Sequence, residues 1–309
     1  MLTITLPYRR LVDSLGADPA RVRVVEWGLT EPLAADVAAE VDVVVVPYYM
    51  ADSGILARLR ALPRLRLVQL PSAGYEHALP HVPPGVIVCN ARGVHDAGTA
   101  ELAIGLVLAS QRGIDVAVRD QLDGRWAGKT LESLADRRVM VLGYGSIGKA
   151  IARRLEPFEV EVVAVARTAR VEDGVVVHGM DELPGLLPTV DVVILITPLT
   201  EKTHGMVDAA FLARMRDGAL LVNMARGKIV DTDALLAEVT TGRLRAALDV
   251  TEPEPLPADH PLWHAPGVII TPHVAGNTRA TDPRLLRLLR EQIARFQAGD
   301  PLLNVIART

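Results

Sequence analysis

The chain has 309 residues, more than one average domain, and its 50% hydrophobic and 23% charged residues are typical of a soluble globular protein with a large core. The formal charge of −4 is spread without long runs of either sign, which excludes the basic surface that nucleic acids or anionic membranes attract, so we expect small metabolites as partners. No charged leader precedes an apolar block, and no window has the ~20 apolar residues that span a bilayer, so we expect a cytoplasmic protein.

Short runs rich in Val, Ile and Leu recur between longer helical stretches in the first third of the chain. Continuous rather than alternating apolarity is typical of parallel strands that are covered on both faces. We predict such strands at residues 2–6, 23–26, 41–46, 66–70 and 86–89. Cys89, the single cysteine, ends the last of them, and we expect it to be buried and to be neither a nucleophile nor a metal ligand. The segment Thr99–Gly113 is apolar on almost every face, which predicts a helix buried between domains or between subunits.

The second half of the chain repeats this pattern. Further strands are predicted at residues 138–142, 160–166, 190–196, 219–223, 246–250 and 268–270. Four prolines between Glu252 and Pro261 predict a loop, because they remove amide donors and fix backbone angles. Residues 284–297 have the pattern of an amphipathic helix, and we expect the extended residues 301–306 to return to the first domain. The fold class that follows is α/β, with two doubly wound parallel sheets.

A glycine-rich loop follows the strand predicted at residues 138–142. Gly143, Gly145 and Gly148 have the spacing of a dinucleotide-binding turn, in which the first glycine permits the bend, the second lets the backbone approach the pyrophosphate and the third packs the helix on the strand. A purely structural turn is the alternative, but the strand before the loop and the helix after it favour a nucleotide site. We assign the whole loop to cofactor binding, namely Gly143, Tyr144, Gly145, Ser146, Ile147 and Gly148.

The segment after the next strand bears on the choice between NAD and NADP. NAD-selective sites place an acidic residue about 20 positions after the glycine loop, where it binds the ribose 2′-hydroxyl. This chain has Arg167 there, followed by Thr168 and Arg170. Guanidinium groups match phosphate geometry well, so these residues predict a 2′-phosphate site and NADPH as the preferred cofactor, with NAD also accepted. A solvated basic loop is the alternative.

Three residues further on have the chemistry for proton transfer. Reduction of a 2-keto acid needs a cation that holds the carboxylate, a donor that protonates the carbonyl oxygen, and a group that orients the donor. Arg226, His273 and Glu254 fill these roles, and each follows a predicted strand, at the edge where open α/β sheets bind ligands. Singly, each is equally well interpreted as a surface or loop side chain. Their joint placement after the glycine loop favours the catalytic interpretation.

Several segments together resemble the D-isomer-specific 2-hydroxyacid dehydrogenase family, in particular its glyoxylate/hydroxypyruvate reductase branch, over nearly the whole chain. They are Leu142–Gly148, Thr197–Thr200 with Thr203, Val222–Gly227 with Asp231, Leu248–Leu256, and Thr271–Gly276. The resemblance implies an NAD(P)-dependent enzyme that interconverts a small 2-keto acid and its D-2-hydroxy acid, with Arg226, Glu254 and His273 as the catalytic three. It also implies a Rossmann nucleotide-binding domain, residues 98–280, inserted into a flavodoxin-like substrate domain, residues 1–97 and 281–309.

The same resemblance implies roles for further residues. The backbone at Ser72, Ala73 and Gly74 would hold the substrate carboxylate, and Asp249 would contact the nicotinamide amide. Other cofactor contacts are implied at Thr197, Pro198, Thr203, Met224, Ala225 and Gly276. One departure from the family pattern is Thr251, which stands where an aromatic residue is usual.

Two aromatic positions bear on substrate choice and assembly. Tyr49, with its neighbours Tyr48 and Met50, ends a predicted strand and is expected to limit the substrate side chain, ordinary strand-end packing being the alternative. Trp126 resembles a position that reaches a neighbouring active site in dimeric relatives, so we expect a homodimer.

Other functions share parts of this pattern. Formate dehydrogenases are similar in architecture, but there the resemblance places glutamine where this chain has Glu254, which argues against them. Phosphoglycerate dehydrogenase stays an alternative, although 309 residues leave no room for an extra regulatory domain. A corepressor-like interaction protein that senses NAD(P) is an alternative of another class, and the absence of a basic or disordered tail argues against it.

Overall fold

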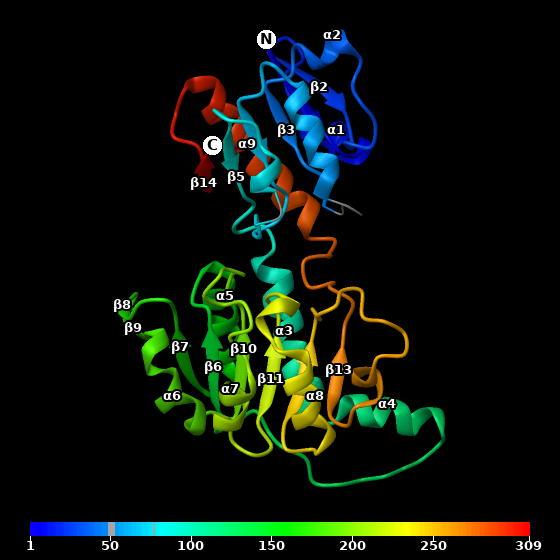
Figure 1. The fold of residues 1–309 in the computed structure, drawn as a ribbon, viewed down its shortest axis with the longest axis vertical. Coiled ribbons are helices and arrows are strands. Elements are labelled where there is room, and N and C mark those ends of the chain that lie inside the picture. The colour runs from blue at the N-terminus through cyan, green and yellow to red at the C-terminus, as the bar shows by residue number, and fades with distance from the viewer. Residues whose placement is uncertain (49–52, 77) are drawn as a thin grey trace. The chain divides into compact units, whose positions relative to one another are not determined.

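The computed structural model describes residues 1–48, 53–76 and 78–309, which fold into two compact units. Unit 1 comprises Met1–His95 and Arg279–Thr309, and unit 2 comprises Asp96–Thr278. Each has a largely parallel sheet with helices packed on it (Figure 1). The predicted α/β fold class is therefore confirmed.

Unit 1 is built on a six-stranded sheet in the order β14-β5-β4-β3-β1-β2. Its strands are β1 (Leu2–Leu6), β2 (Val22–Glu26), β3 (Val43–Val45), β4 (Leu67–Gln69), β5 (Ile87–Cys89) and β14 (Val305–Arg308). The first five strands pair in parallel, in the order 2-1-3-4-5 of flavodoxin-like sheets. β14 pairs antiparallel with β5, so the end of the chain returns to this unit as predicted.

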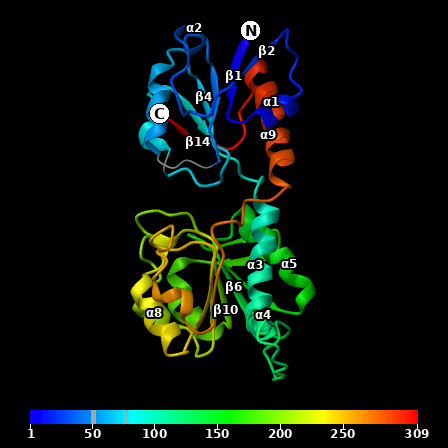
Figure 2. The same cartoon turned by 90° about the vertical axis from the view of Figure 1, so that its right-hand side faces the viewer.

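Both faces of this sheet are covered, because successive strand residues point to opposite sides. Val43 and Val45 pack in one core with helices α1 (Arg9–Leu15) and α9 (Thr281–Ala298), which lie side by side in Figure 2. Val44 packs in the other core, with the 3₁₀ helix η1 (Ser53–Ala61). The remaining short helices are α2 (Ala35–Ala38) and η2 (Leu79–His81). Cys89 is buried, as predicted, and burial raises the pKa of its thiol to about 11, so it stays protonated.

Unit 2 contains an eight-stranded sheet in the order β13-β12-β11-β10-β6-β7-β9-β8. Its strands are β6 (Arg138–Leu142), β7 (Glu161–Val165), β8 (Arg170–Glu172), β9 (Val175–His178), β10 (Val192–Leu195), β11 (Leu220–Asn223), β12 (Arg245–Leu248) and β13 (Val268–Ile270). Every pair except β8–β9 is parallel, and the order reverses between β6 and β10, as in Rossmann sheets. The carboxyl ends of all these strands except β8 therefore share one edge.

Helices pack on both faces of this sheet, with α3 and α5 on one and α8 on the other (Figure 2). The helices of unit 2 are α3 (Asp96–Gln111), α4 (Ile114–Leu122), α5 (Ser146–Leu155), α6 (Leu183–Leu186), α7 (Ala209–Arg214) and α8 (Thr232–Thr240). Short 3₁₀ turns are η3 (Glu156–Phe158), η4 (Met180–Glu182), η5 (Leu187–Thr189), η6 (Gly227–Ile229) and η7 (Pro261–His264). Within the described ranges, no helix combines the length and apolarity needed to cross a membrane.

The apolar helix predicted at residues 99–113 is α3, which packs in the core of unit 2, and its predicted place between domains or subunits stays a prediction. Its buried side chains Ala103, Ile104 and Val107 belong to the core of unit 2, together with Ile151 of α5 and Val139 of β6. A helix that packs on a sheet and on a second helix is covered on most of its circumference. Packing within unit 2 alone therefore accounts for the apolar pattern of α3.

A hairpin in unit 2 was missed. β8 and β9 pair antiparallel through the turn Asp173–Gly174, where both residues have positive φ, 53° and 79°. An Asp-Gly turn of this kind is a strong local hairpin signal, because its twist matches that of the strands. The hairpin bears on the cofactor site, because Arg170, one of the predicted 2′-phosphate residues, is the first residue of β8.

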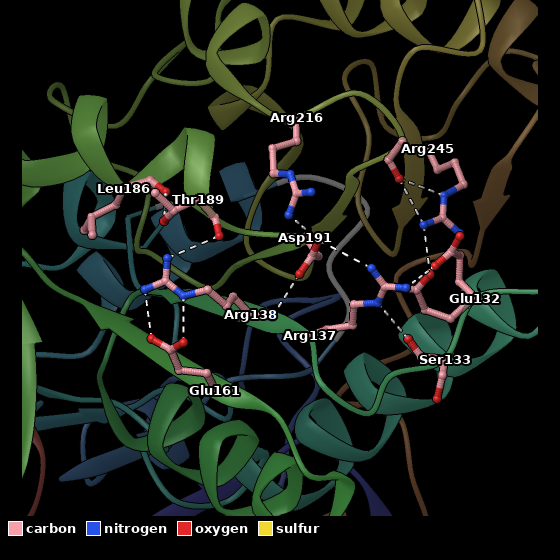
Figure 3. Close-up of polar contacts among 12 residues, drawn as sticks. Glu132, Ser133, Arg137, Arg138, Glu161, Leu186, Thr189, Asp191, Arg216 and Arg245 are labelled. Atoms are coloured by element: carbon pink, nitrogen blue, oxygen red, sulfur yellow. Dashed lines mark hydrogen bonds and ion pairs between the residues drawn. The ribbon is translucent and has the colours of Figure 1, made fainter.

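The opposite, amino-terminal edge of this sheet is joined by arginine–carboxylate contacts around Asp191 (Figure 3). One carboxylate oxygen of Asp191 accepts from the backbone amide of Arg138 at 2.9 Å, and the other accepts from Arg216 at 2.8 Å. The Arg138 guanidinium makes two bonds of 2.8 Å with Glu161. The starts of β6, β7 and β10 are therefore tied together, far along the strands from the edge that bears the predicted site.

Candidate active site

The predicted catalytic and cofactor residues gather at the carboxyl edge of the sheet in unit 2. The glycine loop follows β6, the basic segment follows β7, and the Thr197 loop follows β10. Arg226 follows β11, Glu254 follows β12, and His273 follows β13. Because all six strands are parallel neighbours, one edge carries every one of these loops.

The glycine loop has the shape that a dinucleotide needs. Gly143 has φ of 118°, and a Cβ there would lie 2.5 Å from the carbonyl oxygen of Ile196. At Gly148 a Cβ would lie 2.1 Å from the carbonyl oxygen of Gly143, whereas at Gly145 no atom lies within 4 Å. The outer two glycines therefore allow tight packing, and the middle one faces open space. α5 starts at Ser146 without a side-chain cap, so its first amides are available to a phosphate.

The basic segment is anchored to this loop. Arg167 and Thr168 are exposed, whereas the guanidinium of Arg170 donates to the carbonyl oxygen of Tyr144 at 3.2 Å and to Glu172 at 2.8 Å. Lys149 of α5 donates to the other oxygen of Glu172 at 2.7 Å. These two cations hold the pKa of the Glu172 carboxyl below its usual range. Glu172, which sequence reasoning missed, thus orients Arg170 beside the glycine loop.

The loop after β10 contains one buried hydroxyl without a hydrogen-bond partner in the described part of the chain. That group is Oγ1 of Thr197, and a ligand would satisfy it. Thr203 is engaged instead within the loop, since its hydroxyl donates to the carbonyl of Pro198 at 2.7 Å and accepts from the amide of Thr200 at 2.8 Å. Pro198 is exposed beside them.

The turn that carries Arg226 is braced by Asn223, the last residue of β11. The Asn223 side chain accepts from the amide of Ala225 at 3.0 Å and donates to the carbonyl of Arg226 at 3.0 Å. Met224 and Ala225 are buried, and Arg226 is half-buried. Asn223 thus fixes the turn that carries Arg226, and the sequence analysis did not single it out.

The turn after Arg226 contacts the loop that carries Glu254. A Cβ at Gly227 would lie 1.8 Å from the carbonyl oxygen of Thr251, so glycine is required where the two loops meet. Thr251, which departs from the family pattern, is buried and donates to the carbonyl of Pro253 at 2.9 Å. Its hydroxyl therefore shapes the turn that leads into Glu254.

Glu254 and His273 form the central pair of the site. Nδ1 of His273 lies 2.5 Å from a carboxylate oxygen of Glu254, and the two side chains are 48% and 40% exposed. This hydrogen bond raises the pKa of His273 above its usual 6.5, against the opposing effects of partial burial and of the Arg226 charge. His273 has φ of 51°, an uncommon conformation for a residue with a side chain, and such residues cluster at functional sites.

Asp249 at the end of β12 holds the His273 loop in this conformation. Its buried carboxylate accepts from the hydroxyl of Thr271 at 2.6 Å and from the amides of Val274 and Ala275 at 2.9 and 3.0 Å. The amide of His273 donates to the backbone carbonyl oxygen of Asp249 at 2.8 Å. Gly276 follows at the end of this loop and is half-buried. Asp249 is thus a loop anchor, and its predicted contact with nicotinamide stays a prediction.

The predicted carboxylate binders lie in unit 1. Ser72, Ala73 and Gly74 form a half-buried loop after β4. The carbonyl oxygens of all three accept hydrogen bonds, from the amide of Ala91, the side chain of Asn90 and the hydroxyl of Ser72 respectively. The Ser72 and Ala73 carbonyls are thus fixed by residues that follow β5, and the predicted carboxylate binding by this loop stays a prediction. Tyr49, the predicted limit of the substrate pocket, and its neighbour Met50 lie outside the described residues.

The sequence of unit 2 also identifies its family. Residues 104–275, more than half of the chain, match the NAD-binding domain of the D-isomer specific 2-hydroxyacid dehydrogenases. The chain belongs to this family. It is therefore an NAD(P)-dependent oxidoreductase, as the order of the glycine loop and the acid–base residues predicts.

Individual members of the 2-hydroxyacid dehydrogenase family are similar along most of the chain. Human glyoxylate reductase/hydroxypyruvate reductase is 31% identical over 301 residues, which cover 93% of this chain and 91% of that protein. An NADPH-dependent glyoxylate/hydroxypyruvate reductase from Sinorhizobium meliloti, solved with NADP and sulfate, is 26% identical, with a TM-score of 0.85 over 100% of this chain and 99% of that one. D-3-phosphoglycerate dehydrogenase from Archaeoglobus fulgidus is 34% identical over 229 residues, 72% of this chain but 43% of that protein.

Proposed function

We propose that this enzyme reduces a small 2-keto acid of the glyoxylate or hydroxypyruvate type to its D-2-hydroxy acid, with NADPH preferred over NADH. The observation that carries the proposal is the hydrogen bond between His273 and Glu254, at the same sheet edge as the glycine loop and Arg226. The reduced nicotinamide, when bound, supplies the hydride. The chain itself has to bind the keto acid, exclude water and deliver one proton to the carbonyl oxygen.

His273 is the proton donor in this proposal. Its Nδ1 is engaged by Glu254, so Nε2 is the nitrogen that faces the substrate and gives up the proton. The carboxylate keeps the imidazole protonated until the carbonyl oxygen gains negative charge. Arg226 binds the substrate through its cationic side chain and stabilises that same charge. One hydride and one proton then convert the keto group to a hydroxyl group.

The substrate carboxylate binds the amides of the Ser72–Gly74 loop. The carbonyls of Ser72 and Ala73, which bond to residues after β5, support the assignment, because the N–H of each of these trans peptide groups points the opposite way. Small keto acids suit a site that recognises the carboxylate and the carbonyl. The relatives named for glyoxylate and hydroxypyruvate support this substrate class.

The preference for NADPH is supported by Arg167, Thr168 and Arg170. Arg170 bonds the carbonyl of Tyr144 in the glycine loop. Arg167 is exposed, so its side chain is free of the core and can turn toward a 2′-phosphate. The similar enzyme from Sinorhizobium meliloti is NADPH-dependent. NAD stays the second cofactor of the proposal.

Initial rates test the proposal directly. The loss of absorbance at the reduced nicotinamide band is followed with glyoxylate, hydroxypyruvate, pyruvate and phenylpyruvate, each with NADPH and with NADH. Rapid reduction of glyoxylate and hydroxypyruvate with NADPH supports both parts of the proposal. Cofactor binding without turnover of any keto acid would favour the alternative of a sensing protein.

We expect the protein to be cytoplasmic and to form a homodimer. Ile114, Val118 and Leu122 recur every four residues on α4, so they share one face, and they are 49%, 54% and 83% exposed. Trp126, further along the chain, is 99% exposed. An apolar patch of this kind is typical of a protein interface, and we assign it to a second copy. Leu122→Glu should halve the mass measured by light scattering; an unchanged dimer would place the interface elsewhere.

A further inference from the structure

A histidine with no assigned role bonds the residue just before the Ser72–Gly74 loop, whose amides are proposed to bind the substrate carboxylate. Nε2 of His95 lies 2.6 Å from the carbonyl oxygen of Pro71. A carbonyl oxygen only accepts, so Nε2 carries the proton in this contact. With the bonds to Ser72 and Ala73, this makes three consecutive carbonyl groups that bond to residues following β5. His95 therefore holds the residue that leads into the loop.

The ring of His95 packs against Tyr48, which in turn stacks on Tyr8, and both tyrosines follow the carboxyl ends of neighbouring strands. The imidazole packs edge-on against Tyr48, with the ring centroids 6.1 Å apart and an interplanar angle of 84°. Tyr48 stacks on Tyr8 at 6.2 Å, and its backbone amide donates to the hydroxyl of Tyr8 at 3.0 Å. This aromatic series leaves the imidazole little rotational freedom, and a fixed donor loses less entropy when its bond forms.

The next residue along the chain makes a corresponding contact in the other unit. Asp96 begins α3, and its carboxylate accepts a hydrogen bond from the hydroxyl of Ser146 at 3.3 Å. Ser146 is the first residue of α5 and belongs to the glycine loop. The first segment of unit 1 ends at His95 and unit 2 begins at Asp96. One peptide bond therefore joins His95, which bonds the loop before Ser72, to Asp96, which bonds the glycine loop.

We propose that His95 is a positioning residue for the substrate carboxylate and that the pair His95–Asp96 couples keto-acid binding to cofactor binding. The proposal rests on the proposed function, because it takes the Ser72–Gly74 amides as the carboxylate site. A cofactor that orders the glycine loop also orders Asp96, and through the shared peptide bond it restricts His95 and the loop that His95 holds. The keto acid then binds a loop that has already lost its conformational entropy, so its binding is tighter.

The positioning role is tested with His95→Ala and His95→Gln, and with His81→Ala as the matched control, since His81 is another half-buried histidine of unit 1. We expect His95→Ala to raise the KM for the keto acid about tenfold, the effect of losing one hydrogen bond worth roughly 1.4 kcal/mol, while the Kd for NADPH stays unchanged. Glutamine, whose amide also donates, should restore most of the loss. A KM equal to that of His81→Ala would overturn the role, as would a failure of glutamine to improve on alanine.

The coupling is tested by calorimetry with oxamate, an unreactive analogue of a 2-keto acid, in the presence and absence of NADP⁺. In the unmodified enzyme NADP⁺ should tighten oxamate binding at least fivefold, and in His95→Ala and Asp96→Ala the two affinities should approach each other. Equal tightening in all three proteins would overturn the coupling. Turnover by the unmodified enzyme is measured in parallel, so a failure of the proposed function is recognised separately, by the absence of both turnover and oxamate binding.

Discussion

Nδ1 of His273 lies 2.5 Å from the carboxylate of Glu254, on loops that follow the adjacent strands β13 and β12. The two residues are 19 positions apart in the sequence, and parallel pairing brings their loops to one edge. The contact engages Nδ1, leaves Nε2 as the nitrogen that can donate a proton to the substrate, and raises the pKa of His273. Most of what the enzyme is expected to do depends on this contact.

The pH dependence of reduction should follow from this pKa. Reduction requires protonated His273, so kcat/KM for the keto acid should fall as the pH rises through the pKa of His273, which Glu254 holds above 6.5. Glu254→Gln removes the charged partner, lowers that pKa and moves the falling limb to lower pH. Glu252→Gln, a half-buried neighbour, serves as the control and should leave the limb in place. If the falling limb lies at the same pH in Glu254→Gln as in the unmodified enzyme, Glu254 does not set the pKa of His273.

Asp249 should act on catalysis more than on cofactor affinity. In Asp249→Asn the new amide faces a backbone donor, so one of the three bonds to Thr271, Val274 and Ala275 is lost and the His273 loop loosens. We expect kcat to fall about tenfold or more and the protein to lose about 1–3 kcal/mol of stability. NADPH titration by fluorescence checks the alternative: a large rise in its Kd with kcat maintained would favour the direct nicotinamide contact.

Cofactor selectivity should depend on the two arginines after β7. Arg167→Ala with Arg170→Ala should lower the ratio of kcat/KM for NADPH to that for NADH by about tenfold per arginine, since each charge-assisted bond to a phosphate contributes roughly 1.5 kcal/mol or more. Loss of Arg170 also leaves Lys149 as the remaining cation bonded to Glu172. Arg153→Ala, an exposed arginine of α5, is the control. Equal losses with both cofactors would contradict the 2′-phosphate assignment.

The arginine contacts around Asp191 should matter for stability and not for activity. The side chain of Asp191 is 16% exposed and accepts from Arg138 and Arg216 at the edge opposite to the active site. Asp191→Ala should cost about 2 kcal/mol, a fall in Tm of roughly 4–8 °C, with KM values unchanged. Asp217→Ala, which removes an 88% exposed carboxylate, should change the Tm little. Equal melting of the two variants would show that Asp191 contributes no more than a surface charge.

The strands and the order of the site were predictable because they depend on local pattern. Continuous apolar runs mark parallel strands, and the glycine spacing follows from what the backbone must do beside a phosphate. The hairpin after β7 was also predictable in principle, because Asp173–Gly174 is a strong turn signal. It was missed because β8 is three residues long and carries charged side chains at both ends.

The residues that support the site were not predictable in the same way. Asn223 bonds its own turn, but asparagine is common at the ends of strands whether or not a functional side chain follows. Asn90 reaches Ala73, 17 residues away, and Asp249 reaches Ala275, 26 residues away. Such contacts depend on which strand lies next to which, and pairing order is a property of the whole sheet.

The most direct test of the account is the steady-state kinetics of His273→Ala with NADPH and the best keto acid, together with the Kd for NADPH measured by fluorescence. General acid catalysis by a positioned side chain contributes roughly 10²–10⁴ in rate, so we expect kcat to fall by at least about a hundredfold while the Kd for NADPH changes less than about threefold. Turnover close to that of the unmodified enzyme would contradict the assignment of His273 as the proton donor, and with it the proposed mechanism.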